Sequence, residues 1–189
     1  MRHLLLLFLC SSLSLFTTAS AREVAGISID EKITLANQQA LSLNGAGIRT
    51  KFFFDIYVGA LYVTQPSLKT TEAVLANTEA KRISMHFLYD EVSKEKLNAG
   101  WQDGFELNQD EAQMEKLKQR LNQFKALFIT VKKGDVIDMD YIPGKGTQVT
   151  INTVVKGSIP GNDFHQALMK VWLGDEPADR GLKDALLGN

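Results

Sequence analysis

The stretch Leu43–Val63, LNGAGIRTKFFFDIYVGALYV, decides how the rest of this sequence is interpreted. After the turn-forming residues Asn44, Gly45 and Gly47 it continues to its end without a proline. It is rich in Phe, Tyr, Val and Ile, which are enriched in β-strands. This composition predicts either one long strand or two strands joined by a bend near Lys51.

Alternation along this stretch separates two faces with different chemistry. One face would carry Phe52, Phe54, Ile56, Val58, Ala60 and Tyr62, and the other Arg49, Lys51, Phe53, Asp55, Tyr57, Gly59 and Leu61. The first set predicts a face in the hydrophobic core. The second combines aromatic area with charges and a hydroxyl, which favours a pocket lining over a half-solvated surface. A β-bulge would shift this alternation.

Composition excludes several classes of function. The chain has 189 residues and is 44% hydrophobic, enough for one well-packed domain. A formal net charge of -1 gives no electrostatic basis for binding nucleic acid or an anionic membrane surface. The single cysteine, Cys10, lies in the N-terminal segment, so the remainder has no disulfide, thiol nucleophile or cysteine metal site.

The N-terminus has the organisation of a secretory signal peptide. Arg2 and His3 precede an apolar run, and a small-x-small site ends at Ala21. We therefore expect cleavage after residues 1–21, a mature domain over residues 22–189 and a periplasmic location. An uncleaved anchor is disfavoured because the apolar run is shorter than the roughly 20 residues that span a bilayer. A lipoprotein is disfavoured because bulky Leu9 precedes Cys10. No later stretch is suited to cross a membrane.

The remaining pattern alternates strands and helices. Short strands are expected in residues 22–40 and another over 81–89. A helix capped by Ser93 and a second begun by an Asn108/Glu111 capping box follow, then a hairpin over 136–152 and helices over 164–173 and 179–187. This order predicts an α+β fold, an antiparallel sheet with helices on one face.

Few residues are arranged for catalysis. His86 and His165 lack metal-ligand spacing, and Asp138 with Asp140 is more consistent with a solvated strand face than with a metal site. The glycines before Arg49 lack the spacing of a phosphate loop. We therefore predict no cofactor and no metal.

Arg49 is the leading candidate for a binding residue. It enters the most apolar stretch, where a permanent cation beside a hydrophobic chamber can pair with a ligand carboxylate or phenolate. Tyr57 shares its predicted face and can donate to the same ligand. A structural ion pair or a surface position is the alternative for Arg49.

Three segments resemble the chalcone isomerase-like family, specifically its bacterial exported branch. They are the Leu43–Val63 stretch, HFLYDEVSKEKLNAGWQDGF, and IPGNDFHQALMKVWLGDEPADRGLKDAL, and the match extends over nearly all of the mature chain. The resemblance implies an open-faced β-sandwich, in which a large antiparallel sheet carries a helical layer, with a ligand cleft between them.

The resemblance also implies which catalytic groups are retained. Plant chalcone isomerases use an arginine together with threonine, tyrosine and asparagine groups. The arginine matches Arg49, whereas the strand threonine falls on Tyr57 and a second threonine on Val171. The family's tyrosine and asparagine fall near Val92 or Ser93 and near Ala99 or Gly100. Because several oriented hydrogen bonds are missing, little chalcone cyclisation is expected.

A non-catalytic branch of the same family binds fatty acids, with the arginine and a tyrosine holding the carboxylate. Arg49 and Tyr57 resemble that arrangement better. The expectation is an exported, non-catalytic protein that binds a small amphipathic acid, fatty-acid-like, in the cleft. The alternatives are an isomerase or intramolecular lyase on another substrate, and an envelope structural or assembly factor.

Overall fold

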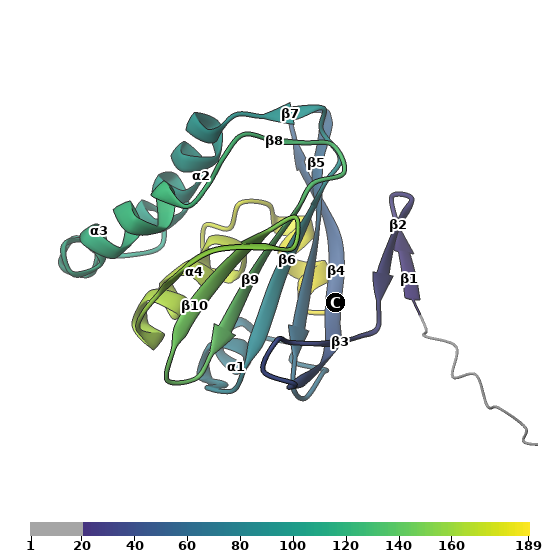
Figure 1. The fold of residues 1–189 in the computed structure, drawn as a ribbon, viewed down its shortest axis with the longest axis horizontal. Coiled ribbons are helices and arrows are strands. Elements are labelled where there is room, and N and C mark those ends of the chain that lie inside the picture. Colours follow the sequence, from purple (N-terminus) through teal and green to yellow (C-terminus); the bar gives the residue numbers. More distant parts are fainter. Residues whose placement is uncertain (1–20) are drawn as a thin grey trace, which may run out of the picture.

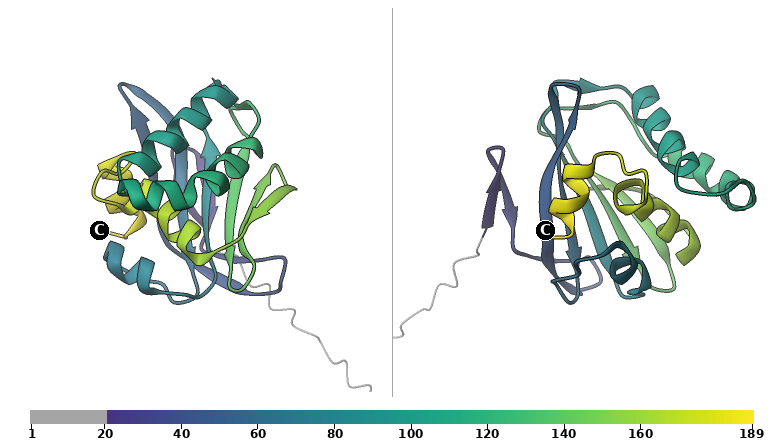
Figure 2. Two further views of the ribbon diagram at one scale, coloured as in Figure 1. Left: turned by 90° about the vertical axis from the view of Figure 1, so that its left-hand side faces the viewer. Right: turned by 180° about the vertical axis from the view of Figure 1, so that it is seen from behind.

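The structure is a computed structural model and describes residues 21–189. It has an α+β fold in which a seven-stranded antiparallel sheet carries helices on one face and a small hairpin on the other (Figure 1, Figure 2). The order of strands is β11-β10-β9-β6-β5-β4-β3. The predicted fold class is confirmed, while the signal peptide, apart from Ala21, lies outside the described residues.

The strands and helices agree broadly with the sequence pattern. The strands are β1 Ala21–Val24, β2 Ile27–Asp30, β3 Lys32–Thr34, β4 Ala40–Lys51, β5 Phe54–Val63, β6 Lys81–Phe87, β7 Glu91–Val92, β8 Val131–Lys132, β9 Val136–Ile142, β10 Gly146–Ile151 and β11 Val154–Ile159. The helices are α1 Thr71–Ala76, α2 Lys94–Glu106, α3 Glu111–Ala126, α4 Asn162–Leu173 and α5 Arg180–Leu186. Among residues 21–189, no helix combines the length and apolar character needed to cross a bilayer.

The Leu43–Val63 stretch forms the β4–β5 hairpin, so the two-strand interpretation is correct. Lys51 pairs with Phe54 across the two-residue turn Phe52–Phe53. The prediction that Phe52 and Phe54 face the core was wrong, because their side chains are 84% and 56% exposed. The pairing of β6 with β5 ends at Tyr57, and the hairpin tip therefore extends past its neighbouring strand.

A β-bulge in β5 shifts the alternation of side chains between the two faces of the sheet. Arg49 pairs with Tyr57 and Thr50 with Asp55, which leaves Ile56 as the extra residue. Ile56 and Tyr57 therefore both lie on the helical side, although strict alternation assigns them to opposite faces. Beyond the bulge the alternation is regular, and β5 is buried on both sides of the sheet.

The glycines before Arg49 lie inside β4 and do not form the predicted turn. A Cβ at Gly45 would lie 2.0 Å from the carbonyl oxygen of Ala185, and one at Gly47 would lie 2.4 Å from the Cβ of Ala185. Their function in the fold is therefore to let α5 approach the strand closely.

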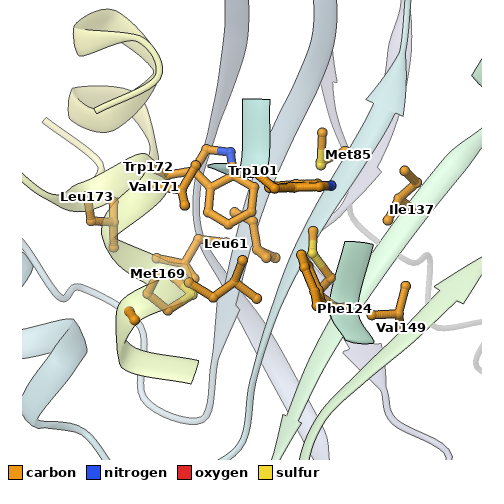
Figure 3. Close-up of a cluster of buried hydrophobic side chains, with 14 of the residues drawn as sticks. Leu61, Met85, Trp101, Phe124, Ile137, Val149, Met169, Val171, Trp172 and Leu173 are labelled. Carbon is orange, nitrogen blue, oxygen red and sulfur yellow. The ribbon is translucent and has the colours of Figure 1, made fainter. Parts of the chain in front are cut away.

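The helical layer covers the concave side of the sheet. Ser93 caps α2 as predicted, accepting from the backbone nitrogen of Lys96. The capping box at Asn108 was wrong: Asp110 caps α3, and the Asn108 amide donates instead to the carbonyls of Gly104 and Glu176. An aromatic cluster fills the space beneath, with the Trp101 ring 5.6 Å from that of Trp172 and 5.4 Å from that of Phe124 (Figure 3).

The opposite face of the sheet carries an ion-pair cluster. Arg82 of β6 contacts Asp140 of the neighbouring β9 through two hydrogen bonds, of 2.5 and 2.7 Å, and Asp138 at 3.2 Å. The expected solvated strand face was wrong for Asp140, which is 3% exposed. Because a carboxylate at such depth needs a cation, the adjacent guanidinium accounts for its position.

Candidate functional site

A cavity lies between α2 and the end of the sheet that carries the β4–β5 turn. Its inner compartment has a volume of about 60 Å³ and its outer compartment about 630 Å³. Arg49, Ile56, Val92, Lys96, Gly100 and Ala178 line both compartments. The outer volume is in the range of small-molecule sites, and Arg49 lies at the junction of the two spaces.

Arg49 is held at this junction without a protein anion. Its Nε is buried and has no hydrogen-bond partner among residues 21–189, and none of the ion pairs in that part of the chain involves it. The guanidinium carbon lies 5.7 Å from the centre of the Tyr57 ring, a cation–π distance. The alternative of a structural ion pair is therefore not observed in this structure.

Tyr57 lies next to Arg49, as the predicted shared face requires. Its hydroxyl oxygen accepts a hydrogen bond of 2.8 Å from Nε1 of Trp172, and no acceptor in the described chain takes its hydrogen. Burial raises the pKa of this hydroxyl, although the Arg49 cation and the Trp172 hydrogen bond lower it in part. The hydroxyl stays protonated at neutral pH and is suited to donate, not to act as a base.

Trp101 is a third donor, although its helical spacing predicted only a core residue. Its Nε1 is buried and lacks a partner among the described residues, and its side chain lines the inner compartment. In Figure 3 the nitrogen lies at the end of the ring that faces Met85 and Ile137, away from Trp172. Helical spacing indicated burial but gave no sign of an unused donor.

The wall around these donors is apolar at the positions that the resemblance singled out. Val92, Gly100 and Val171 all line the inner compartment with Arg49 and Tyr57. Val171, and Val92 and Gly100 as one of the two alternatives at each of their positions, thus present no polar group to this compartment. No atom lies within 4 Å of a Cβ built at Gly100, so that residue leaves the wall open.

The inner compartment is rich in donors, whereas the carboxylates Glu91, Asp103 and Glu176 line only the outer compartment. No histidine or cysteine lines either compartment, and the described residues include no cluster of three metal-ligating side chains. Buried donors without acceptors are destabilising unless a ligand supplies the acceptor. Chemically, the junction is suited to hold an anionic oxygen group beside an apolar wall.

Comparison with known sequences identifies the family. The sequence profile described as chalcone isomerase-like matches residues 21–188. The chain belongs to the chalcone isomerase-like family. No curated protein sequence matches this family member significantly.

One solved structure similar to this chalcone isomerase-like protein is that of the Arabidopsis thaliana fatty-acid binding protein AtFAP1. The TM-score is 0.60 at 16% sequence identity, over 83% of this chain and 96% of the plant chain. Identity at this level establishes a shared fold and nothing about the ligand.

Proposed function

We propose that this protein is exported to the periplasm and binds a small amphipathic acid, of fatty-acid type, without catalysing a reaction. The observation that carries the proposal is Arg49, whose buried Nε has no partner in the described chain and lies at a junction of two cavity compartments. A ligand carboxylate would supply the missing acceptor and charge.

The shape of the cavity supports an orientation for such a ligand. The inner compartment of about 60 Å³ has room for a few water molecules or a small polar group. An acid whose carboxylate lies at Arg49 would therefore place its tail in the outer compartment of about 630 Å³. Ile56, Val92 and Ala178 would contact the first part of that tail.

Within the described chain, the inner compartment, where the donors lie, is lined by no carboxylate and no histidine, which supports binding over turnover. Tyr57 is a neutral donor whose oxygen already accepts a hydrogen bond from Trp172, and Val92 and Val171 carry no polar group. An isomerase that polarises its substrate through Arg49 and Tyr57 alone is the second candidate function. The pair of adjacent donors favours it, and turnover of any substrate without an added metal would support it.

The test is to identify what the protein carries. The mature protein would be purified from the periplasm of its host, extracted under denaturing conditions and analysed by mass spectrometry. We expect a stoichiometric carboxylic acid in the wild type and its loss in Arg49→Met. Lys51→Met is the matched control, because it removes a cation that lines only the outer compartment, away from the junction, and should leave the ligand in place.

Two results would contradict the proposed ligand. An empty wild-type protein, or equal loading of the wild type and Arg49→Met, would remove the argument for a carboxylate at Arg49. N-terminal sequencing of the same preparation tests export separately, because cleavage after Ala21 gives a chain that begins at Arg22.

A further inference from the structure

The tip of the β4–β5 hairpin exposes three consecutive aromatic side chains. Phe52 is 84% exposed, Phe53 96% and Phe54 56%. They extend beyond the strand that pairs with β5, and within the described chain the contact made by Phe54 is an edge contact with Tyr89 at 5.5 Å. Large aromatic groups are seldom left exposed together, so this patch indicates an apolar partner.

Local backbone preferences do not explain the phenylalanines. Phe52 and Phe53 form a two-residue hairpin turn, and Phe52 has a φ of 59°. Glycine and asparagine are favoured at such positions, whereas a bulky side chain with positive φ is strained. Phenylalanine is therefore unfavourable here both for the turn and for solubility. The aromatic side chains must have another role.

The tip is continuous with the mouth of the cavity. Lys51, Phe52 and Phe54 line the outer compartment, and across it lies Leu107, at the end of α2, which is 62% exposed. An apolar partner at the tip would therefore meet the opening through which a ligand reaches Arg49.

We propose that the Phe52–Phe54 tip inserts into the surface of a lipid bilayer and holds the open cavity against it. A narrow protruding hairpin fits a fluid apolar medium, whereas a stable protein interface needs a broad patch of roughly 800 Å² on each partner. Phenylalanine side chains beside a lysine, here Lys51, match the apolar and basic residues of segments that bind at a membrane interface. That the docked cavity takes up its acid from the bilayer rests on the proposed function.

The charges at the mouth indicate how the tip binds. The outer compartment is lined by three cations and three acids: Arg49, Lys51 and Lys96, and Glu91, Asp103 and Glu176. This balance, with a net charge of -1 for the chain, gives no attraction to anionic lipid. Docking is therefore driven by the apolar side chains and is independent of salt.

The test is flotation of the mature protein with vesicles of pure phosphatidylcholine. The test variant combines Phe52→Gly with Phe53→Asn, which removes two aromatic groups and places glycine at the turn position with positive φ, so that folding is maintained or improved. We expect the wild type to float and the variant to lose about tenfold or more of its vesicle affinity. Raising the salt concentration to about 1 M should not release the wild type.

Two controls establish that docking depends on the tip itself. Val154→Thr combined with Val155→Thr removes the other exposed apolar pair, which is 54% and 55% exposed on β11, and should float like the wild type. Arg49→Met should also float, even where it has lost its ligand, so a failure of the proposed function leaves docking intact. The proposal is overturned if the wild type does not float, if the tip variant floats equally, or if binding needs anionic lipid. Self-association through the tip in the absence of vesicle binding would also overturn it.

Discussion

Nε1 of Trp172, in α4, donates a hydrogen bond of 2.8 Å to the hydroxyl of Tyr57, in β5. The two residues are 115 positions apart in the chain and are both almost completely buried. The bond connects the helical layer to β5, an interior strand of the sheet, beside the inner compartment. It also fixes the hydroxyl that lies next to Arg49.

The hydrogen bond between Trp172 and Tyr57 should contribute measurably to the free energy of unfolding. Tyr57→Phe leaves the indole N–H of Trp172 without an acceptor, and we expect a loss of about 1–3 kcal/mol in the free energy of unfolding, measured in urea. Trp172→Phe removes the donor together with packed ring area. The double variant should be less destabilised than the sum of the two, by about 1 kcal/mol. If the free-energy changes of the two single variants add up to that of the double variant, the result would argue against the hydrogen bond. Trp101→Phe is the control for ring loss, because its nitrogen has no partner in the described chain.

The glycines of β4 should tolerate no side chain. Gly47→Val places methyl groups against Ala185 and should destabilise the protein by about 1–3 kcal/mol through displacement of α5. Gly100→Ala is the contrasting change, because nothing lies within 4 Å of the added Cβ and alanine favours a helix. It should gain about 0.5–1 kcal/mol in the free energy of unfolding. Equal effects of the two changes would contradict the packing of α5 against β4.

Stability should fall in acid because of His165. Burial, assisted by the Lys81 cation, lowers the pKa of this residue from 6.5 to about 3. Its ring stacks on Tyr141 at 4.4 Å, and Nδ1 lies 3.1 Å from the Thr147 hydroxyl. Between these two pKa values the unfolded chain binds a proton that the folded protein does not. The stability present above pH 6.5 is therefore lost progressively as the pH falls towards 3.

Lowering the pH from 7 to about 4 should cost the wild type about 3 kcal/mol through this histidine. His165→Phe, which retains a ring beside Tyr141, should show a correspondingly smaller loss over the same range in urea titrations. His86→Gln is the comparison: burial also lowers the pKa of His86, but the side chain is only partly buried, so this change should remove a smaller part of the acid loss. Parallel pH profiles for the wild type and His165→Phe would show that the buried imidazole is not responsible.

Arg49 should lower the stability of the empty protein. Its buried Nε lacks an acceptor, so Arg49→Met is expected to raise the free energy of unfolding of ligand-free protein by about 1 kcal/mol. A loss of stability with no effect on any bound molecule would instead favour the envelope structural factor. Lys96→Met, which also lines the cavity, should leave stability nearly unchanged.

The order of strands and helices could be predicted from the sequence because apolar residues recur at the spacing of a strand or of a helix. The alternation of Val136–Ile142 and the heptad-like spacing of Leu117, Leu121 and Phe124 correspond to β9 and α3. Arg49 and Tyr57 share a face, as strict alternation predicted, but they do so because the bulge at Ile56 sets Tyr57 opposite Arg49 across the hairpin. The spacing of apolar residues was sufficient to predict an element wherever that element is regular along its own length.

The errors arose where a distant segment decided the environment. Phe52 and Phe54 have the composition of core residues, but β6 ends before it can cover them. Gly45 and Gly47 suggested a turn because their constraint comes from α5, about 140 residues later in the chain. The unused donor of Trp101 could not be predicted, because it depends on the absence of an acceptor in three dimensions.

The strand order has a consequence for how the outer wall of the cavity can vary. β6 and β9 are adjacent in the sheet, yet β7, α2, α3 and β8 lie between them in the chain. Val92 pairs with Val131, so this excursion is closed at its base by the short β7–β8 ribbon. Insertions or deletions between these two valines can resize the chamber while every strand register of the meander is preserved. A change in the length of this single segment can thus alter the size of the cavity without disturbing the sheet.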